Sequence, residues 1–335
     1  MSAPLPELRT GPALIKATAP YTEESPWLSW GLTLSSALIL TAAWAALVWA
    51  SLSQALNAWA LSAAGLLVGL LLVRMFVIYH DYAHGAILRK SRIARALMGA
   101  FGVFVLAPPS IWRSSHDYHH KNNSKLRAAH IGSFPVMTVE RWAQTSRSDR
   151  LKYRFLRHPL TIALAYPIGF FFGMCLGPFL RNPRRHWDGA AAVLLHVGLA
   201  ALCWFAGGWE LWLYVHVLPH VVACAVGGYL FYAQHNFPEV EYFDAEGWTY
   251  HAAALDSSSY MKMGPVMNWF TANIGYHHIH HLNARIPFYR LPQVMAEIPE
   301  LQRPRTTSLN PFAVWRCLRL DLWDPRSKRM VRFSG

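Results

Sequence analysis

The chain has 335 residues, of which 53 % are hydrophobic and 15 % charged, against about 25 % charged residues in a typical soluble domain. Its 15 tryptophans indicate a membrane protein, because Trp gathers at membrane–water interfaces. The net charge of +13 comes mainly from loops beside apolar stretches, which favours anionic lipid headgroups and excludes a nucleic-acid-binding protein. The four cysteines form no CxxC pair, so neither a disulfide framework nor a zinc-cysteine site is predicted.

Two apolar stretches near the start, at residues 27–50 and 55–79, are each long enough to cross a bilayer as a helix, which takes about 20 residues. The link at 51–54 joins them into a hairpin. Arg74 is their one charged residue and lies one turn from an end. We therefore expect its side chain to reach the membrane interface.

The second span runs directly into the motif HDYAH, in which His80 and His84 are four residues apart. This spacing places both imidazoles on one face of a helix. Gly85 predicts the end of that helix, because glycine suits the position just after a C-cap.

A second motif, HxxHH, contains His116, His119 and His120, which share one face of a predicted helix. It is flanked by two apolar segments, at 97–112 and 159–180, and both are interrupted by proline or glycine. We interpret both segments as interfacial or half-inserted. A crossing by either one alone would place the histidine motifs on opposite sides of the membrane.

Two further spans are predicted at 189–207 and 211–233, joined by a short link. Neither hairpin link contains Lys or Arg, whereas the centre of the chain and the tail after residue 233 hold nearly all of them. By the positive-inside rule, both hairpins point outward, and the centre and both termini face the cytoplasm.

The third motif, HHIHH, again contains HxxHH, as His277, His280 and His281, and a short helix is expected there. Eight imidazoles exceed what one ion accepts, so two metal ions are implied, and imidazole suits iron, zinc, copper and nickel. Asp81 and Asp117 each adjoin a histidine and are candidates to orient a ring through its other N–H. A single HxxxH is ordinarily a polar surface pair, but three motifs on one side of the membrane are hard to explain by packing.

The three motifs, in this order and topology, resemble the membrane fatty acid desaturase superfamily, which also includes hydroxylases and carotenoid ketolases. The resemblance covers about residues 55–295. The stretch Asn268–Leu291 (NWFTANIGYHHIHHLNARIPFYRL) is similar to bacterial desaturases that act toward the methyl end of the acyl chain, the delta-12 and omega types.

This resemblance implies a single domain, residues 1–335, that is all-α and integral to the membrane. Its four transmembrane helices would form two hairpins under a cytoplasmic helical cap (80–188 and 234–335) that holds a di-iron site. The ligands it implies are the eight motif histidines: His80, His84, His116, His119, His120, His277, His280 and His281. The family usually has one more histidine near the end of the last span, and His235 occupies that place.

The activity implied is oxygen-dependent desaturation of a fatty acyl chain carried by a lipid, coenzyme A or acyl carrier protein. Two iron ions (Fe²⁺/Fe³⁺) and the co-substrate O₂ are expected, in a bacterial inner membrane. Because the chain contains no redox domain, a separate electron donor is needed, and ferredoxin is the first candidate.

Some features depart from the family pattern. The third motif begins with His277 in place of Gln, and the haem-binding HPGG sequence is missing; both count against front-end desaturases. The segment after the second motif, residues 121–134, leaves the acyl carrier open. A carotenoid ketolase or hydroxylase, or an alkane or lipid hydroxylase, would use the same ligands. A His-rich metal transporter would place its ligands at mid-membrane, which the motif positions disfavour. An inactive, metal-stabilised scaffold would tolerate the loss of a ligand, but no motif has lost one.

The remaining histidines are predicted to be bystanders. His216 and His220 form a further HxxxH on the last span, but they precede His235 by 19 and 15 residues, or about 22–28 Å along a helix. With His196, in the middle of the third span, they are expected to form hydrogen bonds between helices. His278 is expected to face away from the metals. A surface or core role is predicted for His130, His158, His186 and His251.

Overall fold

The computed structural model describes residues 8–128 and 131–333. The helices of this part of the chain are α1 (Gly11–Ala17), η1 (Ala19–Thr22), α2 (Pro26–Leu52), α3 (Ala58–Ala83), α4 (Arg92–Phe104), α5 (Pro109–Asn122), α6 (Val139–Gln144), α7 (Arg147–Arg157), α8 (Pro159–Ala163), η2 (Tyr166–Leu176), α9 (Gly177–Arg181), α10 (Trp187–Leu211), η3 (Trp212–Val217), α11 (Leu218–Ala233), α12 (Tyr250–Asp256), α13 (Gly264–Phe270), α14 (His277–Leu282), η4 (Phe288–Arg290), α15 (Leu291–Glu297), η5 (Pro299–Leu301) and α16 (Pro311–Cys317). Two of them, η2 and η3, are π-helical.

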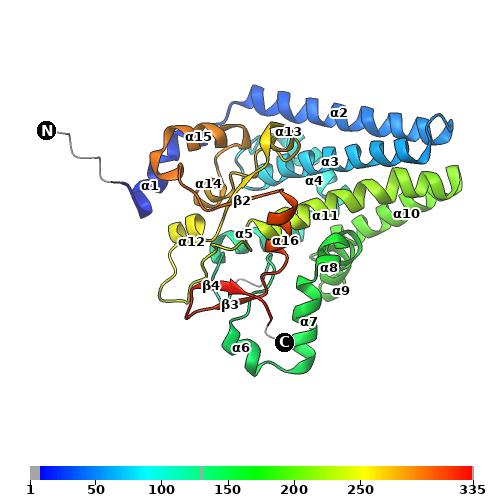
Figure 1. Ribbon diagram of the computed structural model, residues 1–335. Coiled ribbons are helices and arrows are strands. Elements are labelled where there is room, and N and C mark those ends of the chain that lie inside the picture. The colour runs from blue at the N-terminus through cyan, green and yellow to red at the C-terminus, as the bar shows by residue number, and fades with distance from the viewer. Residues whose placement is uncertain (1–7, 129–130, 334–335) are drawn as a thin grey trace.

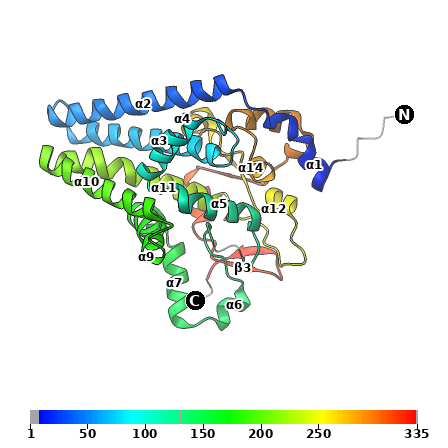
Figure 2. The ribbon, with the colours of Figure 1, turned by 180° about the vertical axis from the view of Figure 1, so that it is seen from behind.

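Four long helices, α2, α3, α10 and α11, lie side by side, and the shorter elements gather around one end of them (Figures 1 and 2). By length and composition, three described helices could cross a membrane: Pro26–Leu52, Ala58–Ala83 and the continuous stretch Trp187–Ala233. The count rises to four if the bent pair α4 and α5, which meet at 90°, forms one span. Large apolar side chains such as Leu38, Leu194 and Phe205 are exposed on the long helices, as a lipid-facing surface requires.

The stretch Trp187–Ala233 is two antiparallel helices. Gly207 and Gly208 have non-helical backbone angles, and Gly208 has a positive φ of 68°, which glycine adopts without strain. The rings of His196 and His216 lie 5.5 Å apart, whereas 20 residues of one straight helix would separate them by about 30 Å. The chain therefore reverses at this glycine pair, next to the predicted link at 208–210.

The two interrupted apolar segments pack beside the long helices. The first comprises α4 and the start of α5, and the chain bends between them just before Pro108 and Pro109. The second comprises α8, η2 and α9. The break in the first segment is confirmed. The second segment breaks only at Leu164 and stays helical from residue 165 to 181, because π-helical turns accommodate Pro167 and the glycines, so the interruption predicted there was wrong. The half-insertion of both segments into a bilayer stays a prediction.

The expectation for Arg74 was wrong. Its side chain is buried, because α3 continues to Ala83 and other elements cover the arginine. The guanidinium donates to Ser36 Oγ, 2.8 Å away, and to the carbonyl of Trp269, and it stacks on the Trp269 ring. These contacts inside the protein replace the polar interface that we expected the side chain to reach.

The region around the end of the helices also contains strands, so the fold is mostly helical where an all-α fold was predicted. The strands β1 (Tyr260–Lys262) and β2 (Thr306–Ser308) pair in parallel, and β3 (Leu322–Asp324) and β4 (Arg329–Val331) pair antiparallel. Each strand has three residues. That is too short to leave a period-two pattern in the sequence.

Candidate metal centre

The first histidine motif lies at the end of α3, as predicted. The helix ends at Ala83 with His84 as its C-cap, and Gly85 follows with a φ of 70°. This left-handed conformation is the one that glycine favours after a helix. The first motif is therefore held by α3, which is more buried than the other two helices that could cross a membrane.

The other two motifs lie on short helices that face the end of α3. α5 begins with a proline, which suits the first helical turn, and it buries His116, His119 and His120. α14 buries His277, His280 and His281. Both helices are where the HxxHH spacing predicted them.

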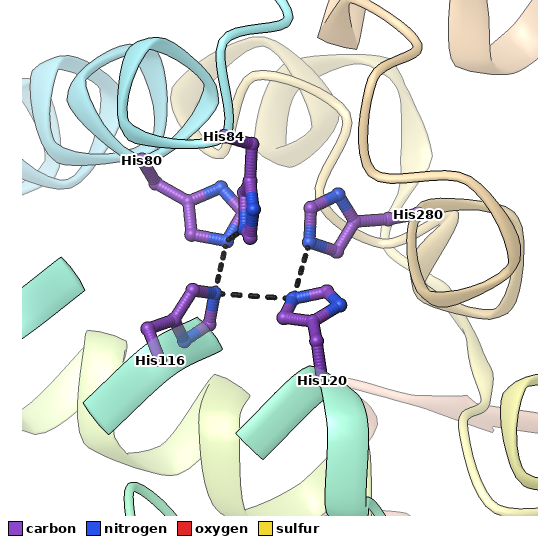
Figure 3. A group of neighbouring side chains, drawn as sticks. All are labelled: His80, His84, His116, His120 and His280. Carbon is purple, nitrogen blue, oxygen red and sulfur yellow. Dashed lines mark hydrogen bonds between the residues drawn. The ribbon is translucent and has the colours of Figure 1, made fainter. Parts of the chain in front are cut away.

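One group of rings joins all three motifs (Figure 3). Its Nε2 atoms are close together: those of His80 and His116 are 2.8 Å apart, and those of His116 and His120 are 3.2 Å apart. The Nε2 atom of His280 lies 3.1 Å from that of His120, and the one of His84 lies 3.3 Å from that of His80. One ring nitrogen from each of the five residues lies within 4.8 Å of the others.

A second group contains His119, His235, His277 and His281, again with ring nitrogens within 4.8 Å of one another. His235 Nε2 lies 2.9 Å from His277 Nε2 and 3.1 Å from His119 Nε2. The two groups are neighbours, because the rings of His120 and His281 stack with their centroids 4.1 Å apart. All nine sequence-predicted histidines are thus brought together, as five and four.

His235 is held by a contact that its sequence context did not reveal. Its Nδ1–H donates to the carbonyl of Ser257, 2.9 Å away, so the lone pair of Nε2 points toward the group. Burial lowers the pKa of His235 to about 4, although the Ser257 hydrogen bond raises it slightly. The ring is therefore neutral at physiological pH and available as a donor.

The two predicted ring-orienting carboxylates differ. Asp81 is buried, with one oxygen 3.4 Å from His80 Nδ1 and the other accepting the Phe288 backbone N–H at 2.7 Å. Asp117 is exposed, and among the described residues it bonds to none of the rings. The prediction that Asp117 orients a ring was wrong, because its side chain faces solvent where that of Asp81 is covered by the segment around Phe288.

The nine rings fit bound metal. Burial lowers the pKa of His277 and of His281 well below the usual value, and neighbouring histidines lower it further. Each neutral ring carries one N–H, whereas His116 Nε2 faces two other ring nitrogens at 2.8 and 3.2 Å. Hydrogen bonds cannot satisfy all of these contacts together, and a cation between the lone pairs can. Neutral imidazole is a ligand for iron, zinc, copper and nickel.

An apolar cavity of about 610 Å³ opens onto both groups. It reaches His80 and His116 of the first group and His277 of the second. Its walls come from α3, α5, η2 and α11, and glycines at 169, 173, 227 and 228 leave room for it. The spacing of four between the glycines at 169 and 173 is the signal in the sequence that one face of η2 is open.

Two of the predicted bystanders are buried but point elsewhere. His278 lies in the third motif, and its Nε2 is 3.3 Å from the carbonyl of Leu301. His186 Nδ1 is 2.8 Å from the hydroxyl of Ser110. Neither belongs to the two groups of rings.

The other bystanders are also outside the two groups. His158 caps the start of α8, His251 is half-buried on α12, and His130 lies outside the described residues. A third group of buried histidines, far along the helices, consists of His196, His216 and His220.

Comparison with known proteins agrees with this geometry. The family model "Fatty acid desaturase" matches residues 57–312. The chain is 33 % identical over 268 residues to "Fatty acid desaturase" of Bacillus subtilis (strain 168), which covers 79 % of this chain and 75 % of that protein. It is 26 % identical over 236 residues to "sn-1 acyl-lipid omega-3 desaturase (ferredoxin)" of Nostoc sp. (strain 36), covering 67 % and 63 %. It is also 26 % identical over 230 residues to "sn-1 oleoyl-lipid 12-desaturase" of Synechocystis sp., covering 67 % and 64 %. The chain therefore spans slightly less than two thirds of these cyanobacterial relatives.

Proposed function

Because this chain belongs to the fatty acid desaturase family, we propose that it introduces a double bond into the acyl chain of a membrane lipid, using O₂ at a di-iron centre. Membership in the family makes the protein an oxidoreductase that desaturates fatty acyl chains. The observation that carries the finer proposal is the apolar cavity that ends at two adjacent groups of buried histidines.

The proposed ligands of one iron are the five histidines of the first group, and those of the other are the four of the second. They are His80, His84, His116, His120 and His280, and His119, His235, His277 and His281. When bound, the two irons would activate O₂, which is the oxidant of the reaction. In the overall reaction, a –CH₂–CH₂– unit, O₂, two electrons and two protons give –CH=CH– and two waters.

The protein's own part is to position the acyl chain and to exclude water. Trp112 stacks on His116, with ring centroids 4.8 Å apart, and Phe231 lies 4.9 Å from His119. Both aromatic residues also line the cavity. The methylene groups that reach the histidines would therefore meet mainly apolar walls, and the inert part of the substrate would hold the reacting part in place.

We place the protein in a bacterial inner membrane, with α2, α3, α10 and the η3–α11 pair spanning the bilayer as two hairpins. The two hairpin ends, near residues 53–57 and 207–208, lie away from the nine histidines (Figure 1). Lys and Arg concentrate in the segments around the histidines. This asymmetry supports a cytoplasmic location of the centre and of both termini.

An acyl lipid is the substrate that the relatives favour, because the Nostoc protein is named an acyl-lipid desaturase and the Synechocystis protein an oleoyl-lipid desaturase. The name of the Nostoc protein also specifies ferredoxin. We propose a ferredoxin as the electron donor here. Acyl-coenzyme A and acyl carrier protein are the competing substrates.

Expression in a bacterial host without polyunsaturated lipids tests the proposal. Fatty acids from each lipid class, analysed by mass spectrometry, should contain a new product two mass units lighter than its precursor. A product heavier by one oxygen would establish a hydroxylase instead. His277→Ala is the inactive control, because alanine offers no ligand atom.

The cavity gives a second test. A Cβ added at Gly227 meets no atom within 4 Å, and Gly227 lines the cavity. Gly227→Leu should therefore occupy acyl space and lower product formation. Gly198 has equally open surroundings but lies outside the cavity, so Gly198→Leu should retain activity. Equal activity of the two variants would contradict the assignment of the cavity to the acyl chain.

A further inference from the structure

Three histidines that belong to neither group of the di-iron centre meet inside the bundle of long helices. His196 comes from α10, His216 from η3 and His220 from α11, and all three are buried. One ring nitrogen from each lies within 4.8 Å of the others. The hydroxyl oxygen of Tyr166, the first residue of η2, lies 3.1 Å from His196 Nδ1 and 3.2 Å from His216 Nε2.

This cluster is remote from the di-iron centre. His220 precedes His235 by 15 residues on one helical stretch, which corresponds to about 22 Å. None of its three histidines shares a group with the nine ligands. Any ion held here would be separate from the proposed irons.

Two of the three rings use one nitrogen to donate a hydrogen bond to a backbone carbonyl, as metal-binding histidines commonly do. His196 Nε2–H donates to the carbonyl of Phe104 at 2.7 Å, which leaves a lone pair on Nδ1. His220 Nδ1–H donates to the carbonyl of His216 at 2.6 Å, which leaves a lone pair on Nε2. A backbone carbonyl that accepts the second ring N–H is the usual way to fix the tautomer of a ligand.

Hydrogen bonds within the cluster do not account for all of its polar atoms. The Tyr166 hydroxyl can donate to His196 Nδ1 and accept from His216 Nε2–H, which satisfies these three groups. The buried Nε2 of His220 then has no partner among the described residues. Trp44 and Phe104, whose rings lie 5.6 Å from that of His220, offer it only apolar surfaces.

The local backbone is also unusual. Tyr166 begins the π-helical segment η2, and His216 lies within the π-helical segment η3. π-Helical turns are rare and occur frequently at functional sites. Here two of them carry residues of the same cluster.

We propose that His196, His216 and His220 bind a third metal ion, a borderline transition-metal ion of the zinc class, with the Tyr166 oxygen as the fourth ligand. Bonds of about 2.0–2.1 Å in a tetrahedron place neighbouring donor atoms about 3.3 Å apart. The Tyr166 oxygen already lies at 3.1 and 3.2 Å from two of the nitrogens. Three imidazoles and one oxygen donor form a set that suits zinc and its neighbours and disfavours magnesium or calcium.

Such an ion would connect η2 to the α10–α11 hairpin next to the acyl cavity. Ala165, the residue before Tyr166, lines that cavity together with Gly228. A Cβ on Gly228 would lie 3.3 Å from the Cβ of Ala165, so the two backbones are close there. The ion would therefore be structural and would hold the wall of the cavity in place.

Cobalt alone is the probe. The full-length chain is purified in detergent, stripped with a chelator and titrated with Co²⁺, and visible absorption is recorded. A tetrahedral site gives strong visible bands, and the four-histidine group of the proposed di-iron centre could add bands of its own. The bands assigned to the third ion are therefore those that His119→Ala, a variant of the di-iron centre, leaves unchanged. We expect them to account for one equivalent of Co²⁺.

His220→Asn is the decisive variant. The asparagine amide N–H can still donate to the His216 carbonyl, but the side chain has no ligand atom at the position of Nε2. These bands should disappear, and added zinc, which we expect to raise the unfolding temperature of the unmodified chain, should raise it less. His216→Ala, as a second variant, should lose the same equivalent. The proposal is overturned if His119→Ala retains no strong bands, or if the bands it retains persist in both His220→Asn and His216→Ala. Because no readout depends on a desaturated product, this result is independent of the proposed activity.

Discussion

α3 and α11 pack against each other, and each positions ligands of the proposed di-iron centre: His80 and His84 at the end of α3, and His235 after α11. Gly69 makes this close packing possible. A Cβ added at Gly69 would lie 2.6 Å from Val222 Cβ and 2.9 Å from the carbonyl oxygen of Pro219. Both atoms belong to or adjoin the backbone of α11, so no rotation of a side chain can relieve the clash. Gly69→Ala must push the two helices apart.

The magnitude follows from two opposing terms. Overpacking of a close contact destabilises by about 1–3 kcal/mol, and replacement of glycine by alanine inside a helix stabilises by roughly 0.5–1 kcal/mol. The difference spans about 0–2.5 kcal/mol, and because a contact of 2.6 Å leaves no room for a Cβ we expect a destabilisation of about 1–2 kcal/mol. At about 2–4 °C for each kcal/mol in a large domain, Tm should fall by roughly 2–8 °C. Because His80 ends α3 and His235 follows α11, iron content should fall as well.

Gly198→Ala is the matched control. Gly198 also lies inside a long helix, α10, but a Cβ there would meet no atom of the described chain within 4 Å. The variant has the same gain in helix propensity without the clash, so its Tm should stay unchanged or rise slightly. Thermal unfolding in one detergent, followed by intrinsic Trp fluorescence, compares the two. A Gly69→Ala protein as stable as Gly198→Ala would refute the close packing of α3 on α11.

Three further predictions concern the centre itself. Purified active protein should contain about two irons per chain by elemental analysis; active protein that holds zinc in place of iron would contradict the di-iron assignment. His277→Ala should lose iron and product, whereas His278→Ala should keep both, because the Nε2 atom of His278 lies beside the Leu301 carbonyl and that of His277 lies beside His235; similar losses in the two variants would be evidence against the grouping. His235→Ala should lower iron content and activity together, measured on the same preparation, and normal iron content would show that His235 is not a ligand.

Much of this architecture could be predicted from the sequence, because local rules determine it. The spacing of His80 and His84 and the position of Gly85 defined a helix end, and the structure confirms it. The long apolar stretches gave the long helices to within a few residues. These features depend on helical periodicity and on the backbone freedom of glycine, both of which are properties of short segments.

The features that sequence analysis missed depend on contacts between distant segments. Asp117 has the same sequence relation to a histidine as Asp81, yet only Asp81 is buried near a ring. Arg74 is buried because Ser36 and Trp269, far away in the chain, meet its guanidinium. No local pattern distinguishes such cases.

The division of the nine histidines into two groups follows a simple rule of helix geometry. Each pair at i and i+4 belongs to one group: 80 with 84, 116 with 120, and 277 with 281. The histidine at i+3 in each HxxHH motif, residue 119 or 280, belongs to the other group. Residues four apart on a helix point within about 40° of each other, whereas adjacent residues diverge by about 100°. α5 and α14 therefore each contribute to both groups, so the rigid backbone of two short helices sets the distance between the proposed irons. The HxxxH motif on α3 serves only the first group, and His235 brings the second from three rings to four. In the proposed centre, His235, a histidine outside every motif, would therefore complete the second group.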